Sequence, residues 1–358
     1  MTGEKQLRIG FLGAGLIATY HSKSLRRSGA EQECGVVRAG VFDPDPDRAE
    51  AFAAASGHHV CASEDEVLDS CDAVYICTWT SEHPRMVEAA ALRGLGVFCE
   101  KPLAVDLAAA TRTARAVRAA GVTNQVGLVL RHSPAYLWAR HLVTEPEAGR
   151  VMTVVFRDDQ FIPTQGHYAS TWRADRARAG AGTMLEHSIH DVDMLRFVVG
   201  DIARISATTA NFHGHAGIED VASAVIAFRT GATGTLTSVW HDNLARPSLR
   251  RVEVFCERRH IVIEGDDWLG PVRWTDADGT EGLLEGPSLI GATATMIDGT
   301  QGAAGRHNPD GAFVRAVAAG TAASPDMTVA LEAHRVVDAI YRSAAAGGSA
   351  VDVEQGDD

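Results

Sequence analysis

The feature that most constrains the fold is a regular alternation of short apolar runs and amphipathic segments over the first third of the chain. The amphipathic segments have the length and periodicity of helices and cover residues 16–27, 44–55, 83–93 and 107–119. The apolar runs are too short for helices and cover residues 7–12, 36–42, 73–77, 97–99 and 122–126. Apolar strands separated by helices are typical of a parallel sheet that is covered on both faces. Residues 1–126 are therefore predicted to form a doubly wound α/β domain.

The pattern changes after residue 126. Longer, partly alternating runs follow, joined mostly by turns, at residues 151–157, 203–210, 221–228, 232–240 and 251–256. This signature is typical of an antiparallel sheet with one covered face, and Gly231 and Gly234 indicate a hairpin at residues 229–235. Helices are predicted at 184–199, where the helix helps to cover the sheet, and at 310–319 and 328–346. We predict a second, α+β domain over residues 127–346 and a flexible acidic tail over 347–358, with no assignment for the aperiodic stretch 264–311.

The charge balance excludes several classes of function. The chain has 33 basic and 46 acidic residues, a formal net charge of −13. Such a surface disfavours contact with nucleic-acid phosphates and with anionic lipids. No apolar run approaches the roughly 18–20 residues that span a bilayer, and the polar N-terminus leads directly into a strand, so no signal peptide is expected. The six cysteines form no C-x-x-C pair, which favours reduced thiols and a cytoplasmic protein.

A glycine motif, Gly13-x-Gly15-x-x-Ala18, stands where the first predicted strand turns into the first predicted helix. In this context the first glycine permits a tight turn, the second lets a pyrophosphate approach the backbone, and the small third residue allows close helix–strand packing. The helix that begins at Leu16 and Ile17 offers free N–H groups to the phosphates. A plain glycine turn is the alternative interpretation.

Asp43 favours the dinucleotide interpretation. It ends the second predicted strand, where an acidic side chain binds the ribose hydroxyls of the adenosine. Its separation from Ala18 is slightly longer than usual, and a longer loop at residues 28–35 would absorb the excess. A 2′-phosphate near this carboxylate would be repelled, and no arginine directly follows Asp43 to offset the repulsion, since four residues separate it from Arg48. NAD is therefore predicted in preference to NADP.

A second motif, Glu100-Lys101-Pro102, follows the fourth predicted strand. The carboxyl ends of the strands of a doubly wound sheet face the ligand. A lysine in this apolar neighbourhood is suited to proton transfer, because desolvation lowers the pKa of an ammonium group. The alternative is a surface lysine that pairs with Glu100.

Together with the stretch 180–193, these motifs resemble the Gfo/Idh/MocA oxidoreductase family. Residues 78–83, the junction from residue 126 to Pro134, and Trp172-Arg173 also fit, so that the resemblance covers nearly the whole chain. Members of the family use NAD or NADP to oxidise or reduce a carbinol carbon of sugars, cyclitols and related compounds. The resemblance implies an α/β chain with an N-terminal Rossmann domain. It further implies a C-terminal domain whose large, mostly antiparallel open sheet supports homodimers or homotetramers.

The third motif is the stretch from Glu186 to Asp193. On a continuous helix Glu186 and His190 would share a face, while His187 would point about 100° away. Metal binding by these three side chains is one interpretation, although a fourth ligand is not evident, and a structural histidine is another. The resemblance places an Asp-x-x-x-His pair here, beside the nicotinamide, and so favours catalysis. Glu186 departs from that pattern, which leaves it as either a proton relay or a ligand for a substrate hydroxyl.

The predicted site follows from these parts. Lys101 and His190 are expected to meet over the nicotinamide, where His190 takes the hydroxyl proton and Lys101 bonds the same oxygen, with Glu186 as the third catalytic residue. No metal is predicted. Further cofactor contacts are expected from Thr78, Trp79, His83 and Glu100, where Trp79 replaces a proline that is common in the family. Further substrate contacts, to a polyol or sugar of undecided charge, are expected from Arg131, His167, Trp172, Arg173 and His241.

Two other functions stay open on the sequence alone. The family includes enzymes that cleave a glycosidic bond through transient oxidation with tightly held NAD. The same architecture also occurs in NAD(P)-binding regulators, although such a protein would not need both Lys101 and His190.

Overall fold

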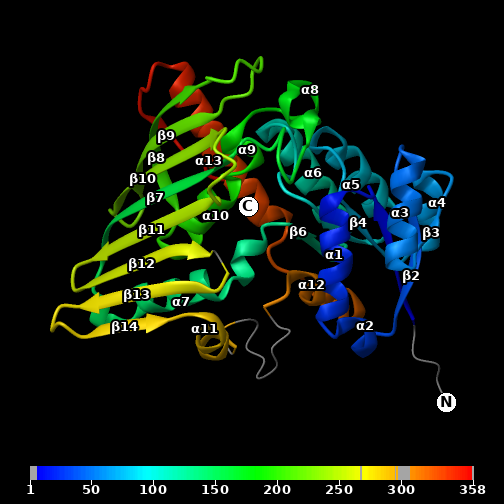
Figure 1. Ribbon diagram of the computed structural model, residues 1–358, viewed down its shortest axis with the longest axis horizontal. Helices are drawn as coiled ribbons and strands as arrows, with labels where there is room; N and C mark the ends of the chain where they lie inside the picture. Colours follow the sequence, from blue (N-terminus) through cyan, green and yellow to red (C-terminus); the bar gives the residue numbers. More distant parts are fainter. Residues whose placement is uncertain (1–5, 267, 295, 297–306, 357–358) are drawn as a thin grey trace. The chain divides into compact units, whose positions relative to one another are not determined.

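The computed structural model describes residues 6–266, 268–294, 296 and 307–356, and the chain forms two compact units (Figure 1). The first unit contains Met1–Leu128 and the later segment Asn308–Leu331. The second contains Val129–His307 and Glu332–Asp358. The organisation therefore differs from the predicted one, in which a single boundary at residue 126 separates two continuous domains.

A six-stranded parallel sheet forms the centre of the first unit, in the order β3-β2-β1-β4-β5-β6. Its strands are β1 (Leu7–Leu12), β2 (Val36–Phe42), β3 (His59–Val60), β4 (Ala73–Ile76), β5 (Gly96–Cys99) and β6 (Asn124–Val126). Its helices are α1 (Leu16–Arg27), α2 (Ala30–Glu33), α3 (Pro46–Ser56), α4 (Glu64–Ser70), α5 (His83–Leu92), α6 (Leu107–Ala120) and α12 (Pro309–Ala319). The predicted doubly wound fold is confirmed, while β3 and α4 were not predicted because neither has a long apolar run. The strand order reverses between β1 and β4, which is where such sheets bind ligands.

The core of this unit shows why a C-terminal helix belongs to it. The rings of Phe11, Tyr75 and Phe98, from β1, β4 and β5, stack with centroid distances of 4.8 and 4.7 Å. Phe313 of α12 is fully buried and packs edge-on against Tyr75 and Phe98. Because α12 supplies part of this aromatic core, the first unit is complete only with residues far along the chain.

A nine-stranded sheet dominates the second unit, in the order β14-β13-β12-β11-β7-β10-β9-β8-β15. Its pairs are antiparallel except for the parallel pair β7–β10, which confirms the prediction of a mostly antiparallel sheet. The strands are β7 (Val151–Phe161), β8 (Ile202–Ala210), β9 (Val221–Phe228), β10 (Thr233–His241), β11 (Leu249–Cys256), β12 (Arg259–Asp266), β13 (Gly270–Asp276), β14 (Glu281–Leu284) and β15 (Val351–Asp352). The hairpin predicted at 229–235 joins β9 to β10.

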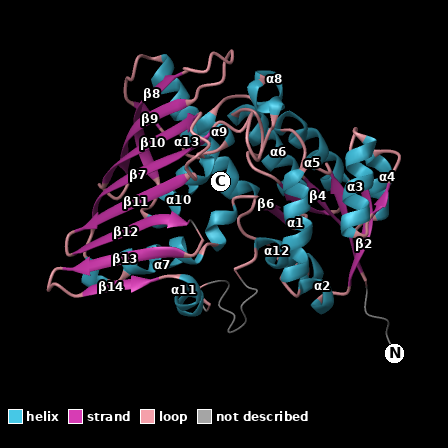
Figure 2. Ribbon diagram, viewed as in Figure 1, coloured by secondary structure: helices cyan, strands magenta, loops and turns pink. Residues whose placement is uncertain are grey.

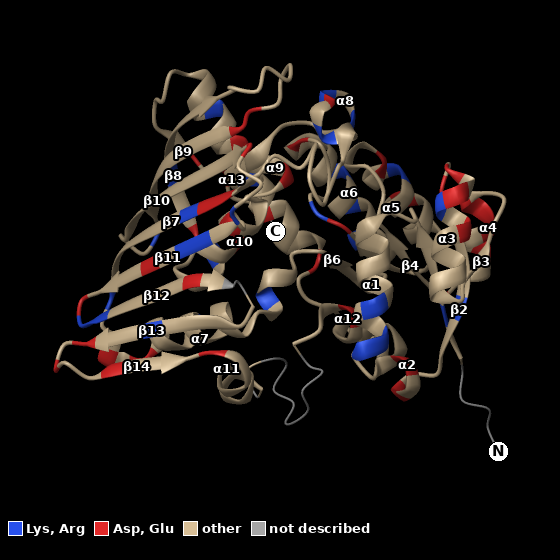
Figure 3. Ribbon diagram, in the orientation of Figure 1, with Lys and Arg blue, Asp and Glu red and all other residues tan. Residues whose placement is uncertain are grey.

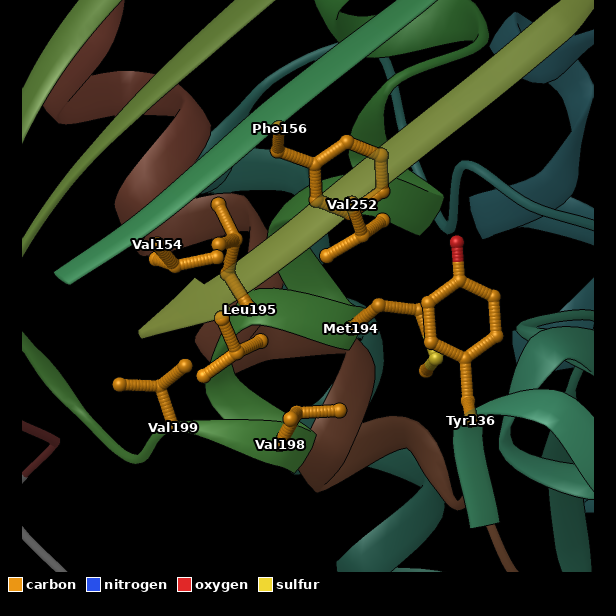
Figure 4. Close-up of a pocket in the computed structure, with 9 residues that line it drawn as sticks. Tyr136, Val154, Phe156, Met194, Leu195, Val198, Val199 and Val252 are labelled. Atoms are coloured by element: carbon orange, nitrogen blue, oxygen red, sulfur yellow. The ribbon is translucent and has the colours of Figure 1, made fainter. Parts of the chain in front are cut away.

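Helices cover one face of this sheet. Figure 2 shows α7 (Pro134–Thr144), α10 (Ile189–Val198) and α13 (Met327–Ala345) on the same side of the strands. The shorter helices of the unit are α8 (Arg176–Ala179), α9 (Thr183–Glu186) and α11 (Gly286–Thr293). Where α10 packs on the strands, a small pocket remains (Figure 4), and its lining is almost entirely apolar: Tyr136, Val154, Phe156, Met194, Leu195, Val198, Val199, Val252 and Val254. Such a lining suits core packing and not a polyol.

The C-terminal segment differs from the predicted flexible tail. Val351 and Asp352 form β15, which pairs with Ile205 and Arg204 at the edge of the sheet. The Asp352 carboxylate accepts a hydrogen bond from Arg204 at 2.6 Å. Residues 357–358 of the predicted tail lie outside the described residues. None of the helices in the described ranges combines the length and the apolar character that a membrane span requires.

Candidate active site

The turn between β1 and α1 has the geometry of a phosphate-binding loop. Gly13 has a φ of +90°, and a Cβ atom there would lie 2.5 Å from the carbonyl oxygen of Cys77, so that only glycine fits. Gly15 begins α1, and a Cβ atom there would have no neighbour within 4 Å. Open space therefore lies beside the backbone at the position where the motif predicts a pyrophosphate.

The start of α1 is open to a ligand as well. Within the described chain, no side chain caps this helix terminus, so its first N–H groups remain available. Leu16 and Ile17 are 49% and 39% exposed, whereas Ala18 is fully buried against the sheet. An uncapped helix N-terminus is a favourable site for an anion, and together with the space at Gly15 it fits the predicted dinucleotide.

Asp43 is bound to the glycine turn. Its Oδ2 accepts a hydrogen bond from the backbone N–H of Ala14 at 2.8 Å, which holds the carboxylate beside the loop. Arg48, the first arginine after Asp43, pairs with Asp45 at 3.1 Å. Residues 28–35, predicted to form a longer loop, contain the short helix α2 and account for the wide spacing of the motif.

Glu100 lies inside the first unit and not on its surface. Only 7% of the residue is exposed, and its Oε1 accepts a hydrogen bond from His21 Nε2 at 2.8 Å. The other ring nitrogen of His21 lies 2.7 Å from Asp310, at the start of α12. Burial alone would lower the pKa of His21, but the charges and hydrogen bonds of Asp310 and Glu100 outweigh it and raise that pKa to about 10. Burial also opposes the ionised Glu100, and the hydrogen bond from His21 nevertheless holds the carboxyl pKa below its ordinary value.

The remaining predicted cofactor residues occupy three different environments. Lys101 follows Glu100 at the end of β5, is half-buried, and its backbone N–H donates to Glu100 Oε2 at 3.2 Å. His83 is 1% exposed and its Nδ1 lies 2.8 Å from the carbonyl oxygen of Pro102. Thr78 and Trp79 follow β4 and are half-buried. Glu100 and His83 thus support the Lys101 segment from within.

The helix predicted at 184–199 is interrupted. It consists of α9, which ends at Glu186, and α10, which begins at Ile189, with non-helical φ and ψ of −122° and −63° at His187. The prediction that Glu186 and His190 share one helix face is therefore wrong. The interruption coincides with a hydrogen bond of 2.6 Å from the Ser188 hydroxyl to the hydroxyl of Ser238 on β10.

Glu186 is paired with an arginine. Its Oε2 accepts a hydrogen bond from Arg173 Nε at 3.2 Å, and its side chain is 1% exposed. The guanidinium of Arg173 lies 4.4 Å from the ring centre of Trp172, as in a cation–π contact. The structure therefore brings together three of the predicted substrate residues. His190 lies nearby in sequence on the first turn of α10 and is 9% exposed.

His187 belongs to a separate buried cluster. Its Nε2 lies 2.6 Å from Asp158 of β7 and 3.1 Å from Arg250 of β11. Arg250 also binds Asp191 at 2.7 Å, and Figure 3 shows the acidic and basic positions of β7 and β11 side by side. Burial, followed by the charge of Asp158, raises the pKa of Asp191 to about 7. Because His187 is engaged in this cluster, the geometry does not favour the metal-binding interpretation, and no group of three metal-ligating side chains occurs among the described residues.

The other predicted substrate residues are dispersed within the second unit. Arg131 donates hydrogen bonds to both oxygens of the buried Asp193, at 3.1, 2.9 and 2.7 Å, so that its charge is compensated internally. His241 lies 3.4 Å from Asp159, which also binds Arg246. His167 is exposed on the segment between β7 and α8.

Sequence reasoning missed two groups of interacting side chains: His21 and Asp310 in the first unit, and Asp158, Asp191 and Arg250 in the second. His21 lies one helical turn after Ile17 and faces the sheet, a position where a polar residue within an apolar stripe was the available signal. Asp310 is 289 residues away from His21, and no local pattern connects them.

Comparisons with known proteins agree with this architecture. Residues 7–128 match the family model described as oxidoreductase family, NAD-binding Rossmann fold, and residues 136–262 match the GFO/IDH/MocA C-terminal domain. An inositol 2-dehydrogenase of Rhizobium meliloti is 30% identical over 240 residues, which cover 65% of this chain and 68% of that protein. A scyllo-inositol 2-dehydrogenase (NAD(+)) of Bacillus subtilis is 33% identical over 64% of this chain and 66% of the relative. The match to an inositol 2-dehydrogenase of Cereibacter sphaeroides, at 32% identity, covers 60% of this chain and spans only 61% of that relative's length.

Solved structures share the fold. An oxidoreductase domain protein of Kribbella flavida superimposes with a TM-score of 0.85 at 24% identity, over 98% of this chain and 100% of that one. A levoglucosan dehydrogenase in complex with NADH superimposes with a TM-score of 0.84 at 21% identity, with the same coverage. The sequence matches to both halves, the six-stranded parallel sheet and the open nine-stranded sheet lead to one conclusion: this chain belongs to the Gfo/Idh/MocA oxidoreductase family, and its first unit is an NAD-binding Rossmann domain.

Proposed function

We propose that the protein is an NAD-dependent dehydrogenase that acts on a secondary alcohol carbon of a sugar, cyclitol or related polyol. The observation that carries this proposal is the combination of an open phosphate-binding turn at Gly13 and Gly15 with Lys101, which ends a strand of the same sheet. His190 on α10 completes the set of groups that such a reaction needs. The relatives named as inositol dehydrogenases support the substrate class.

The cofactor is proposed to lie along the carboxyl ends of the Rossmann strands. The N–H groups at the start of α1 bind its pyrophosphate, and Asp43 accepts hydrogen bonds from the adenosine ribose. The open space at Gly15 and the bond from Ala14 to Asp43 fit these two roles. When bound, NAD supplies the acceptor for the hydride that leaves the alcohol carbon.

The protein residues handle the proton and position the substrate. His190 accepts the proton of the substrate hydroxyl as the C–H bond breaks, so that the alcohol becomes a ketone and one proton is left on the imidazole. Lys101 donates a hydrogen bond to the same oxygen and stabilises the negative charge that develops there. His190 is held on a buried helix, and Lys101 is held through Glu100 and His83.

Glu186 is proposed to bind a substrate hydroxyl and not to relay a proton. Its carboxylate is buried and accepts a hydrogen bond from Arg173, which orients it as a hydrogen-bond acceptor. We expect Glu186→Gln to raise KM for the polyol by about 10-fold, the cost of weakening one hydrogen bond to a charged group. The pH dependence of kcat should keep its wild-type shape, because His190 is intact. A shift of the acidic limb in this variant would instead identify Glu186 as part of the proton path.

A screen of NADH absorbance tests the proposed function as a whole. Purified protein is mixed with NAD or NADP and with cyclitols, aldoses, sugar acids and amino sugars in turn. Net NADH formation with a free polyol is the expected result. Stoichiometric NAD that does not exchange, together with cleavage of a glycoside and no net NADH, would contradict simple dehydrogenation and identify glycosidic cleavage. Binding of NAD without turnover of any substrate class would identify a regulator.

Cofactor preference gives a separate prediction. We expect kcat/KM with NAD to exceed that with NADP by about 10-fold or more, because a 2′-phosphate about 4 Å from the Asp43 carboxylate is repelled by up to ~4 kcal/mol. Asp43→Asn should reduce this ratio, since the amide keeps an acceptor for the Ala14 N–H but removes the charge. Asp47→Asn, on α3, is the matched control and should leave the ratio unchanged. Activity with NADP alone would contradict the assignment.

The outer face of the nine-stranded sheet is proposed to bind a second copy of the chain. Val155, Thr235 and Val225 are aligned across β7, β10 and β9, and the two valines are 43% and 60% exposed. Large apolar side chains that are exposed together on a sheet face favour an interface. We expect light scattering to show an oligomer for the wild type and for Val60→Lys, an exposed edge position of the first unit, and a monomer for Val225→Lys. A monomeric wild type would contradict the proposal.

A further inference from the structure

The short helix α9, which ends at Glu186, is held by groups from outside its own sequence. It has four residues, and an isolated helix of this length is not stable in water. Its position, and with it the position of Glu186 and the following residues, must therefore come from tertiary contacts. These contacts converge on one buried carboxylate, that of Glu219.

Glu219 lies directly before β9 and is 9% exposed. Its Oε2 accepts a hydrogen bond from the N–H of Gly182 at 2.8 Å, and its Oε1 accepts one from the N–H of Met184 at 2.9 Å. The backbone oxygen of Glu219 accepts a third from Thr183 at 2.9 Å. Three consecutive N–H groups at the start of α9 are thus bound by a single residue.

The same contact explains Gly182. A Cβ atom at this position would collide with the backbone oxygen of Glu219, so that no other residue permits the approach. The close contact between the segment before α9 and the segment before β9 therefore depends on a residue in each segment: the glycine at position 182 and the glutamate at position 219.

Tyr341 of α13 extends the network. Its hydroxyl donates a hydrogen bond to Glu219 Oε1 at 2.8 Å and accepts one from the N–H of Leu185 at 3.2 Å. Burial raises the pKa of the Tyr341 hydroxyl well above its ordinary value, so that it keeps its proton and remains a donor to the carboxylate. The helix α13 is thereby connected to the residue that precedes Glu186.

A group of three hydroxyls fixes the interruption between α9 and α10. Thr183, Ser188 and Ser238 are fully buried, and Ser238 of β10 lies 2.7 Å from the Thr183 hydroxyl and 2.6 Å from that of Ser188. The backbone N–H of Ser188 donates to the oxygen of Thr183 at 2.8 Å. Thr183, before His187, and Ser188, after it, are therefore both hydrogen-bonded to strand β10.

From these contacts we infer that Glu219 and Tyr341 are positioning residues: they set the relative placement of Glu186 and His190 without contacting the substrate themselves. The inference rests on the proposed function, in which those two side chains bind and deprotonate the alcohol. A displacement of about 1 Å in a reacting group is sufficient to lower a rate by about 10²-fold.

The test compares two hydroxyl deletions on the same helix. Tyr341→Phe removes hydrogen bonds to Glu219 and Leu185. Ser343→Ala, two residues further along α13, is the matched control, because its buried hydroxyl bonds Ala207 and Ser349 and none of the residues of α9. Glu219→Gln is the third variant, since it sets an amide N–H against an N–H of Gly182 or Met184.

The readouts are kcat and KM with NAD and the polyol found in the screen, the thermal midpoint, and hydrogen exchange of peptides that cover residues 182–191. Tyr341→Phe and Glu219→Gln are expected to lower kcat by about 10²-fold with KM for NAD unchanged, and to accelerate exchange in that segment. Ser343→Ala should lower the thermal midpoint to a similar degree without either effect. Equal losses of kcat in Tyr341→Phe and Ser343→Ala, or unchanged exchange in residues 182–191, would overturn the inference.

The proposed function and the positioning role fail in different ways. Absence of turnover by the wild type with every polyol would refute the proposed function, and the exchange experiment would still decide whether Glu219 and Tyr341 hold the segment. Normal turnover of the wild type together with wild-type kcat in both variants would refute the positioning role alone.

Discussion

Replacement of Lys101 or His190 by alanine is expected to lower kcat by about 10²–10⁴-fold, the usual contribution of a positioned acid–base group. Lys101 follows β5 in the Rossmann unit, and His190 is buried on the first turn of α10 in the second unit. Each is proposed to act on the oxygen of the alcohol and not on the dinucleotide phosphates. The dissociation constant of NAD, measured by quenching of protein fluorescence, should therefore stay close to that of the wild type.

Two surface substitutions serve as controls for this experiment. Lys23→Ala removes an exposed lysine from α1, and His59→Ala removes an exposed histidine from β3, so that charge and residue type are matched without a change at the site. Both should turn over like the wild type. Near-normal kcat in Lys101→Ala and His190→Ala together would remove the catalytic assignment.

The second large effect is on stability. His21→Gln is expected to lower the free energy of unfolding by about 3–5 kcal/mol, because removal of one partner from a buried ionic group leaves uncompensated charge behind. His21 is completely buried between Glu100 and Asp310, at 2.8 and 2.7 Å. A glutamine can donate to one of these carboxylates but supplies no positive charge. Urea unfolding of wild type and variant at pH 7 measures the difference.

The pH dependence of stability has a defined sign. The pKa of His21 rises from 6.5 to about 10 on folding, so that the protonated imidazole is favoured in the folded state. Its stabilising contribution is complete below pH 6.5 and declines as the pH rises towards 10. Wild-type stability should therefore decrease across this alkaline range. In His21→Gln the corresponding decrease should be absent.

His58→Gln provides the comparison for this slope. His58 is also buried in the first unit, but burial and the charge of Arg38 lower its pKa to about 4, and its Nδ1 lies 2.9 Å from the Ser56 hydroxyl. Because this histidine is neutral above pH 6.5 in both states, its replacement should leave the alkaline slope intact. An identical slope in wild type and His21→Gln would show that the ion pairs of His21 do not contribute to the free energy of unfolding.

The elements that sequence reasoning predicted well are those with a local physical signal. The glycine turn and Asp43 stand at strand ends that continuous apolar runs define, and the structure has them in contact through Ala14. The hairpin between β9 and β10 follows from alternation interrupted by glycine, and Gly231 has a φ of +90° there. The parallel, doubly wound character of the first sheet also follows from the repeated strand–helix pattern.

The elements that were missed depend on contacts between distant segments. The interruption at His187 is accompanied by a bond between Ser188 and Ser238, which are 50 residues apart in the chain. Glu100 is bound by His21, which also binds the distant Asp310. Gly127 packs against the Glu100 carboxylate, and a Cβ atom at this position would collide with it. The pairing of Arg131 with Asp193 was also missed, because Asp193 has the same appearance in the sequence as any acidic residue on a helix. Side-chain pairing of this kind has no periodicity that a single sequence reveals.

The assignment of α12 to the first unit has a consequence for recombination between members of this family. A gene crossover near codon 128 would transfer the glycine turn and the lysine but leave Phe313 and Asp310 with the other parent. The resulting chimera would combine the stacked rings of β1, β4 and β5 from one parent protein with the α12 residue that packs against them from the other. Exchange of the nucleotide-binding half by genetic shuffling therefore requires two separate inserts, the second of which carries the codons of residues 308–331.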